Sequence, residues 1–269
     1  MRLTSWNLLH GQAMPADEEV DPSALLTAEI ARLRSDLIGL QEVDYFLARS
    51  GTHNQVGNIA SMMGATDWAF APSLMGSPDD DWRNLDEGDE RIVTQNSKIS
   101  LPGYGIGIVS KIPVISWHRL DLKASPVGLM MTFPVDGKRK RFYVRDHPRS
   151  AIAAVLDNGW LVINTHLSFV PVFSILQLLK IKRWANTLSI HDKAKIIIMG
   201  DLNLPMSIFA HGFAWHSLAI QRTFPSWYPK VQIDYFLSQK LRNADVRHIQ
   251  YPHSGMSDHL PLQIEVDVN

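Results

Sequence analysis

Cysteine is absent from this 269-residue chain, which excludes disulfides, thiolate metal sites and cysteine nucleophiles. The net charge is close to zero as well, because the sequence contains 26 lysines and arginines and 27 aspartates and glutamates. Proteins that hold duplex DNA usually carry a basic stripe that neutralises phosphates, and the overall composition shows no such excess. The sequence also lacks an uninterrupted apolar run of roughly 18 to 20 residues, the length that a membrane-spanning helix needs.

The first residues contain no long apolar stretch after Arg2, so the sequence predicts no signal peptide and a cytoplasmic location. Hydrophobic residues make up 45% of the chain and charged residues 20%, which is sufficient for a full buried core. No internal repeat, low-complexity linker or break in composition divides the sequence. We therefore expect one domain over residues 1–269, and a monomer.

Apolar runs of strand type alternate with helical stretches, which predicts an α/β fold. A helix is expected to begin at Asp21 and Pro22, an N-cap residue followed by proline at the first helical position. Further helices are expected at 54–63 and 171–189. Strands are expected at 3–9, 36–42, 66–71, 104–110, 114–122, 129–135, 141–144, 150–156, 160–165, 195–199, 233–237 and 259–266. The strands 104–110 and 114–122 are expected to be neighbours, and 72–103 to be a long loop of the functional or mobile kind.

Polar side chains stand where several of these apolar strands stop, and in α/β folds such strand ends gather at one edge, where ligands bind. The residues concerned are Asn7, Glu42, His166, Asp201, Asn203, Asp234, Asp258 and His259. Several have an ordinary structural explanation, such as a turn for Asn7, a solvated strand end for Glu42, and a hydrogen-bonded buried histidine for His166. Asp201 would fit an Asx-turn in the same way.

Asp234 is different, because it lies inside a predicted strand between Ile233 and Tyr235, where an unpaired carboxylate is costly. It needs a partner, and a histidine is the natural one. Taken together, the polar residues offer carboxylates and amides without thiolates or histidine clusters. Such ligands suit Mg²⁺ or Mn²⁺ and argue against zinc, while Asp–His pairs suit general acid–base catalysis.

Six short motifs resemble, in chain order, the successive signatures of the endonuclease/exonuclease/phosphatase superfamily. They are Trp6-Asn7, Leu40-Gln41-Glu42-Val43, Thr165-His166-Leu167, Gly200-Asp201-Leu202-Asn203, Ile233-Asp234-Tyr235 and Ser257-Asp258-His259-Leu260-Pro261. That superfamily includes deoxyribonucleases, abasic-site endonucleases, inositol polyphosphate 5-phosphatases, neutral sphingomyelinases and deadenylases. The match spans nearly the whole chain, and the ordered set is far more specific than any one motif. The resemblance implies a four-layer α/β/β/α sandwich of two mixed, mainly antiparallel β-sheets flanked by helices.

The resemblance also implies a divalent-metal-dependent phosphoesterase, which hydrolyses a phosphodiester or phosphomonoester by in-line attack of an activated water. By similarity, Glu42 is the principal ligand of Mg²⁺ or Mn²⁺, and Asn7 and Asp258 lie near the metal or the scissile phosphate. Asp201 orients or deprotonates the water, and Asn203 holds Asp201 or a phosphate oxygen.

Two histidines receive roles from the same resemblance. His259, paired with Asp234, contacts the phosphate and assists proton transfer, and His166 donates to a phosphate oxygen. Arg149 begins a strand where relatives often carry an arginine beside the cleft, although a solvated arginine explains it equally well. One departure is Ile106, because many relatives carry asparagine there, which leaves a polar role for that strand open.

The substrate is less clearly indicated. A histidine at 166 resembles deoxyribonucleases, sphingomyelinases and phosphatases more than abasic-site endonucleases, which argues against DNA repair. The basic cluster Lys138-Arg139-Lys140-Arg141 is explained either by a solvated β-turn or by binding of a polyanion. The acidic segment 79–90 is explained by a solvated loop, by a lid or by a second cation site. A small-molecule or lipid phosphoester is favoured, with a nuclease as the alternative. A non-catalytic binding module is the remote alternative, because every motif residue is present.

Residues 169–181 predict an unusually apolar helix directly after His166. One face carries, at helical spacing, Val172, Ile175, Leu176 and Leu179. A wide core-facing helix explains this pattern, and so does an apolar rim that receives a lipid tail, a membrane surface or a partner chain. Exposure of Phe169, Phe173 and Leu178 would favour the rim.

Overall fold

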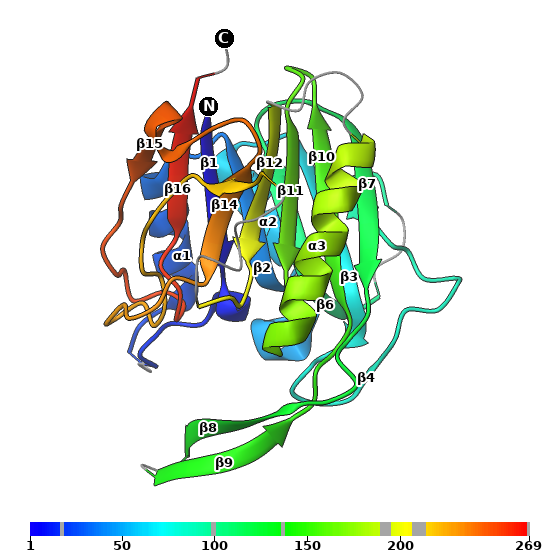
Figure 1. Ribbon diagram of the computed structural model, residues 1–269. Helices are drawn as coiled ribbons and strands as arrows, with labels where there is room; N and C mark the ends of the chain where they lie inside the picture. The colour runs from blue at the N-terminus through cyan, green and yellow to red at the C-terminus, as the bar shows by residue number, and fades with distance from the viewer. Residues whose placement is uncertain (17–18, 98–100, 136–137, 189–194, 206–213, 268–269) are drawn as a thin grey trace.

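Two β-sheets lie face to face in the computed structural model, which describes residues 1–16, 19–97, 101–135, 138–188, 195–205 and 214–267 (Figure 1). The first sheet, within these residues, has the strand order β15 (Val246–Ile249), β16 (Leu262–Val266), β1 (Arg2–Asn7), β2 (Leu37–Tyr45), β6 (Gly103–Ser110), β3 (Asp67–Gly76) and β4 (Trp82–Arg83), with β5 (Val93–Thr94) also paired to β3. The second has the order β13 (His216–Ser217), β14 (Asp234–Ser238), β12 (Ile196–Asp201), β11 (Leu161–His166), β10 (Arg149–Leu156) and β7 (Val114–Leu122).

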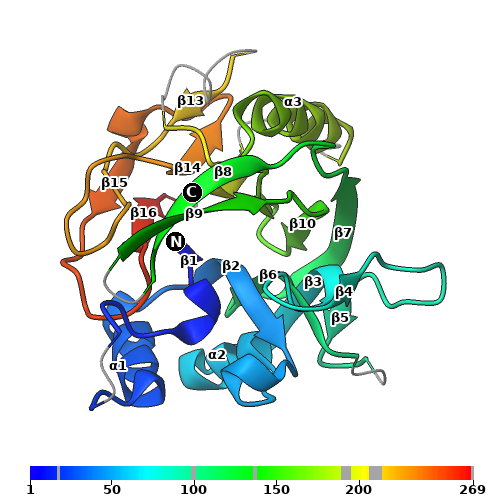
Figure 2. The same cartoon turned by 90° about the horizontal axis from the view of Figure 1, so that it is seen from below.

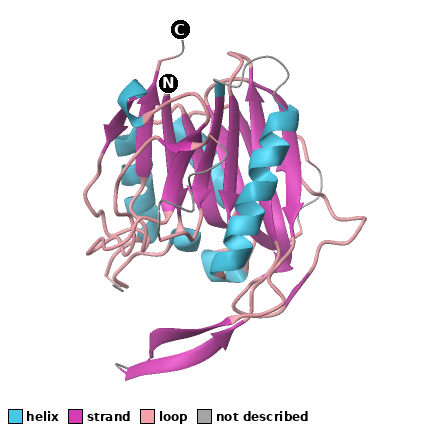
Figure 3. Ribbon diagram, in the orientation of Figure 1, coloured by secondary structure: helices cyan, strands magenta, loops and turns pink. Residues whose placement is uncertain are grey.

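Helices cover the outer faces of both sheets, as Figures 2 and 3 show. The first sheet packs against α1 (Pro22–Leu33) and α2 (Gln55–Met63), and the second against α3 (Pro171–Leu188). Short 3-10 turns occur at Leu9–Gly11, Ala48–Ser50 and Asn243–Asp245. The pairs β1–β2 and β11–β12 are parallel, and the other described pairs are antiparallel. The predicted four-layer sandwich of mixed, mainly antiparallel sheets is therefore confirmed.

The main core lies between the sheets, where inward-facing aliphatic side chains of both sheets meet. It includes Leu3 and Ile108 from the first sheet and Ile152 and Phe236 from the second. Ile106 is 1% exposed in this core, so it has no polar role, and its strand offers none at that position. None of the described helices is long and apolar enough to cross a membrane.

A polar contact between Gln41 and Asn164 joins the sheets near the middle. The Gln41 Nε2 donates to Asn164 Oδ1 at 2.6 Å, and Asn164 Nδ2 donates to the carbonyls of Leu40 and Gly107 at 2.8 Å each. Gly39 leaves room for this pair, since a Cβ there would lie 2.9 Å from the Asn164 side chain. These buried contacts link the two sheets beneath Asn7 and Glu42, while Gln41 Oε1 has no hydrogen-bond partner among the described residues.

The helix ends follow the sequence closely. Asp21 caps α1 by accepting a hydrogen bond from the Ser23 amide at 2.9 Å, with Pro22 at the first helical position, as predicted. Asn54 caps α2 through the Gly57 amide in the same manner. The third helix ends at Leu188, and the expected last residue, Ser189, lies outside the described residues.

Several strand predictions were wrong in detail. The strands β6 and β7 are not neighbours, because β6 pairs with β2 and β3 whereas β7 pairs with β10 in the other sheet. Every described residue of β6 is buried, as suits a central strand, while most of β7 is partly exposed at an edge. The chain crosses between the sheets at 111–113.

Two strand bounds also differ from the prediction. The strand β3 continues to Gly76 through a register shift after Pro72, and β16 begins at Leu262.

A two-stranded hairpin, β8 (Leu129–Val135) and β9 (Lys138–Val144), pairs with neither sheet and projects away from the sandwich (Figures 1 and 2). The basic cluster lies on β9 instead of in a turn, which corrects the prediction, and Gly137 lies outside the described residues. The side chains of Arg139, Lys140 and Arg141 are exposed.

Candidate active site

The polar strand ends gather at one edge of the sandwich, as expected. Asn7 ends β1 with Gln41 as its register partner, and Glu42 lies at a bulge within β2, which continues to Tyr45 instead of ending at Glu42 as predicted. His166 and Asp201 are register partners at the ends of the parallel strands β11 and β12. Asp234 begins the antiparallel strand β14 directly opposite Asp201. Parallel pairing within each sheet thus places these side chains together.

Asn7 connects the two sheets at this edge. Its Nδ2 donates to Glu42 Oε1 and to Asp201 Oδ2, at 3.0 Å each, while its Oδ1 accepts from the Leu9 amide at 3.1 Å. Asn7 is fully buried, and Asp201 is 2% exposed. One amide therefore separates two carboxylates that would otherwise repel each other at short range.

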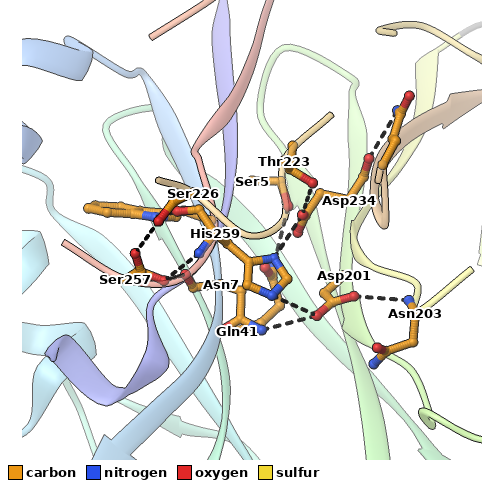
Figure 4. Close-up of polar contacts among 12 residues, drawn as sticks. Ser5, Asn7, Gln41, Asp201, Asn203, Thr223, Ser226, Asp234, Ser257 and His259 are labelled. Atoms are coloured by element: carbon orange, nitrogen blue, oxygen red, sulfur yellow. Dashed lines mark hydrogen bonds and ion pairs between the residues drawn. The ribbon is translucent and has the colours of Figure 1, made fainter. Parts of the chain in front are cut away.

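His259 and Asp234 form the expected pair. His259 Nδ1 lies 2.9 Å from Asp234 Oδ2, and His259 Nε2 lies 3.8 Å from Asp201 Oδ2 (Figure 4). The Thr223 hydroxyl donates to the same Asp234 oxygen at 2.5 Å. Burial lowers the pKa of His259, but the charge and hydrogen bond of Asp234 outweigh that effect and raise its pKa to about 10. At neutral pH the imidazole is therefore cationic.

Asp201 lies between this histidine and Asn203. Its Oδ1 accepts from the Asn203 amide at 2.9 Å, which completes the Asx-turn suggested by the sequence. Burial raises the pKa of Asp201 to about 7, although the positive charge of His259 opposes the increase. Gly200 has φ +144°, and a Cβ there would lie 1.9 Å from the Thr165 carbonyl, so only glycine brings β11 and β12 this close.

His166 is buried on the other side of Asp201. Its Nε2 lies 3.2 Å from Asn203 Nδ2, 3.5 Å from Asp201 Oδ2 and 4.0 Å from Glu42 Oε1. Burial, followed by the charge of Arg149, lowers the pKa of His166 well below its usual value. The site therefore contains one cationic and one neutral histidine, on opposite sides of the same carboxylate.

Backbone conformation reinforces the arrangement. Glu42, Asn203 and Ser257 have φ values of 52°, 51° and 58°, in the left-handed region that costs energy for residues with a Cβ. The β2–β6 register shifts between Leu40 and Val43, and such a bulge re-aims a side chain at Glu42. Backbone strain at these three residues is maintained only if the surrounding structure holds them, which indicates a preorganised site.

A divalent cation fits the donors present. Burial, followed by the charge of Asp258, raises the pKa of Glu42, and burial raises that of Asp258, although the positive charge of His259 opposes both increases. Asp258 Oδ1 is buried without a hydrogen-bond partner among the described residues. Asp201, Asp234 and His259 also offer ligand atoms within 4.8 Å of one another. Because Asp234 and His259 bind each other, the oxygens of Glu42 and Asp258 suit a hard cation better.

Arg149 is 4% exposed, so the explanation as a solvated strand-start arginine is wrong. Its Nη2 lies 3.6 Å from Asp146 Oδ1, too far for a hydrogen bond, and its Nε and Nη1 have no hydrogen-bond partner in the part of the chain that is described. Its charge acts on both His166 and Glu42. An anion beside this guanidinium would satisfy it.

Three supporting residues, Thr223, Phe224 and Ser257, were given no role from the sequence. Thr223 holds Asp234, and the Phe224 ring lies against His259 with centroids 5.1 Å apart. The Ser257 hydroxyl donates to the Asn7 carbonyl at 2.7 Å and accepts from the His259 amide at 3.1 Å. Thr223 and Phe224 lie in a loop before β14, where no periodic pattern marks them.

Exposure of Val172 and Leu176 contradicts the core-facing explanation of the apolar helix, and the three residues whose exposure would favour the rim give a mixed result. Leu178 is buried, Phe169 and Phe173 are partly exposed, and Val172 and Leu176 are 64% and 55% exposed. The buried face instead includes polar residues such as Gln177, which accepts from the Ser168 amide and donates to the Lys123 carbonyl. These contacts hold the loop after His166, so the inward face of the helix combines polar residues with the core residues Leu178, Ile181 and Ala185.

Comparison with known proteins agrees with this architecture. A family model described as the Endonuclease/Exonuclease/phosphatase family matches residues 4–259. A family protein from Bacteroides thetaiotaomicron superposes with a TM-score of 0.58 at 12% identity, covering 99% of this chain and 98% of that one. A family member from Beutenbergia cavernae gives 0.55 at 17% identity, covering 99% and 71%. ANGEL2, a 2',3'-cyclic phosphatase, gives 0.57 at 13% identity, covering 98% and 93%. No curated protein matches the chain.

Two facing sheets with carboxylates, amides and histidines at one edge define the phosphoesterase fold of this superfamily. The chain belongs to the endonuclease/exonuclease/phosphatase family.

Proposed function

We propose that this protein is a Mg²⁺- or Mn²⁺-dependent phosphoesterase that hydrolyses its substrate by in-line attack of an activated water. The observation that carries the proposal is the continuous network in which Asn7, Asp201, His259 and Asp234 join the two sheets. A binding module would have no need of a buried histidine that is paired with one carboxylate and lies 3.8 Å from a second.

His259 offsets charge on the phosphate. Asp234 keeps its imidazole protonated and fixes Nδ1, which leaves Nε2–H available beside Asp201. A cation that is already oriented needs little reorganisation when negative charge grows on the phosphate oxygens. The neutral His166 and the Asn203 amide supply further polar contacts from the opposite side.

Asp201 is the group best placed to accept a proton. Burial raises the pKa of Asp201 above that of a free aspartate, which makes its carboxylate a stronger base for a water. Asn7 and the Asn203 amide orient its two oxygens. Glu42 and Asp258, with Asn7 nearby, would hold the cation, which when bound withdraws charge from the phosphate and stabilises the leaving oxygen.

A substrate panel tests the proposal. Turnover is measured with Mg²⁺, with Mn²⁺ and with a chelator on bis-p-nitrophenyl phosphate, single- and double-stranded DNA, RNA, sphingomyelin and inositol phosphates. We expect hydrolysis of at least one phosphoester, its loss with the chelator, and recovery when the metal is restored. Turnover that is indifferent to the chelator would contradict the metal requirement.

Within that panel, we propose a small-molecule or lipid phosphoester as the substrate. Exposed apolar side chains occur on the first turns of α3 and on the hairpin, including Val172, Leu176, Met130 and Phe142. They accompany the exposed basic side chains of β9, a combination that suits the surface of an anionic lipid layer. The soluble protein is proposed to be a monomer that contacts such a surface through these residues.

A nuclease is the second candidate, favoured by the same basic hairpin. Arg139 and Arg141 with the exposed ring of Tyr143 could hold a single strand through its phosphates and bases. In that case the KM for DNA or RNA should rise steeply with salt. A salt-independent KM would argue against nucleic acid.

A further inference from the structure

A cavity of about 360 Å³ opens beside Arg149, between the end of β7 and the loop that joins β4 to β5. Figure 2 shows these elements together on one side of the face that carries the strand ends. The charged side chains that line the cavity are Arg91, Arg119, Asp121, Lys123 and Arg149. Asp146 lies 3.6 Å from Arg149, so these four cations are opposed by two carboxylates, Asp121 and Asp146, which leaves two excess positive charges.

Arg119 and Asp121 form the fixed wall of this cavity. Arg119 donates from Nε to Asp121 Oδ1 at 2.7 Å, from Nη1 to the Arg91 carbonyl at 2.6 Å and from Nη2 to the Pro72 carbonyl at 2.7 Å. Arg91 Nη1 lies 2.8 Å from Asp121 Oδ2. Asp121 therefore balances part of these two charges and leaves Lys123 and Arg149 without a carboxylate at hydrogen-bond distance among the described residues.

Arg149 is the second, independent indication of a ligand. It is 4% exposed, yet its Nε and Nη1 make no hydrogen bond to any described residue. Burying a guanidinium with unpaired donors is costly, and a bidentate anion is the partner whose geometry fits them. Arg149 also links the cavity to the candidate active site, because it lines the cavity and its charge acts on the buried His166.

We propose that this cavity is a subsite for a second anionic group of the substrate, a phosphate or a carboxylate. The proposal rests on the proposed function, in which the scissile phosphate lies among Asn7, Asp201 and His259. Arg149 would bind the second group at the border of the cavity, and Lys123 would attract it from the exposed side. The substrate class is then a phosphoester with two anionic groups, either free or as a lipid headgroup.

The test compares α,ω-alkanediol bisphosphates of two to six carbons with alkyl monophosphates of the same lengths. We expect kcat/KM to favour the bisphosphate at least about tenfold at one chain length, since one tenfold step corresponds to a single additional charge-assisted contact. The variant Lys123→Gln should reduce that preference severalfold, mainly through KM. Lys195→Gln is the matched control, because Lys195 precedes β12 at the far end of the sheet and should leave the preference unchanged.

Equal kcat/KM for the two series at every length, with no effect of Lys123→Gln, would overturn the subsite. Turnover of bis-p-nitrophenyl phosphate reports separately on the proposed function, so the two failures are distinguishable. If no bisphosphate is hydrolysed, calorimetric binding of hexanediol bisphosphate decides: binding weakened by Lys123→Gln supports the subsite, and absence of binding overturns it. Presenting one phosphorylated headgroup free and on vesicles distinguishes a soluble substrate from a lipid.

Discussion

At the scale of the residue, the site depends on single residues that each hold two others, Asn7 through its side chain and Asn203 through both its amide and its side chain. Asn7 binds Glu42 and Asp201, which come from different sheets, and Asn203 holds Asp201 and His166. The motifs indicated which residues would meet but not how they are linked, since nothing local in the sequence encodes the contact of Asn7 with Asp201. The Asp234–His259 pair was predictable, because a carboxylate inside an apolar strand requires a partner.

Replacing Asn7 tests the link between the sheets. Asn7→Ala removes the donor between Glu42 and Asp201, so kcat/KM should fall by about 100-fold, as expected for a buried donor in a catalytic site. The measurement is steady-state hydrolysis of bis-p-nitrophenyl phosphate. Asn96→Ala, at an exposed asparagine, is the control and should behave as the wild type. A loss below threefold in Asn7→Ala would contradict the assigned link.

Thr223 is a positioning residue in this account, because it acts on His259 only through Asp234. Thr223→Val keeps the shape and removes the hydroxyl, so kcat should fall about tenfold while KM changes little. Thr27→Val, at the exposed Thr27 of α1, is the matched control. If Thr223→Val alters only the melting temperature, the threonine is structural alone.

At the scale of the element, alternation of strands and helices with the cap at Asp21 predicted most boundaries to within a few residues. The assignment of strands to sheets was harder. Consecutive strands usually pair, yet β6 and β7 lie in different sheets because the chain crosses over at 111–113. Polar residues on the buried face of α3 were not foreseen either, since Gln177 is turned inward by contacts with distant loop backbone.

The projecting hairpin gives a prediction at this scale. Its residues Met130 and Phe142 are 61% and 44% exposed, on a ribbon that neither sheet supports. The double variant Met130→Asp, Phe142→Asp should reduce sedimentation with anionic phospholipid vesicles at least tenfold. Ile115→Asp, at a 69% exposed residue of β7, is the control and should sediment as the wild type. Unchanged sedimentation of the double variant would contradict the lipid-contact proposal.

Hydrogen bonds hold part of the segment 79–90 in place, in addition to its exposure to solvent. Arg83 bonds Asp89 at 2.5 and 2.9 Å, and these bonds, with the Asp86 amide, lower the pKa of Asp89 from 3.8 to about 2. Folding that lowers a carboxyl pKa contributes stability above the unfolded pKa, and this stability is lost as the pH falls through the folded pKa.

The stability difference between the wild type and Asp89→Asn should therefore be constant above about pH 5 and shrink between about pH 4 and pH 2. Thermal unfolding followed by circular dichroism over this range measures it. Asp86→Asn, at a side chain that is 75% exposed, should show a much smaller difference throughout. A difference for Asp89→Asn that does not change with pH would contradict the role of the Arg83 bond.

At the scale of the whole molecule, the site belongs to neither sheet alone. Asn7 and Glu42 come from the first sheet, and His166, Asp201 and Asp234 from the second. The Gln41–Asn164 contact and the shared core hold the sheets in register beneath the site. Such a site forms only when both sheets have folded and docked, so its chemistry depends on the complete sandwich.

The central claim is that His259, held by Asp234 beside Asp201, takes part in metal-dependent phosphoester hydrolysis. Its most direct test is kcat/KM of His259→Ala with saturating Mg²⁺ or Mn²⁺, alongside thermal unfolding of the same sample. We expect a loss of at least about 1,000-fold with the melting temperature nearly unchanged, because a preoriented cation is removed from the phosphate site. Turnover close to that of the wild type in His259→Ala would contradict the account.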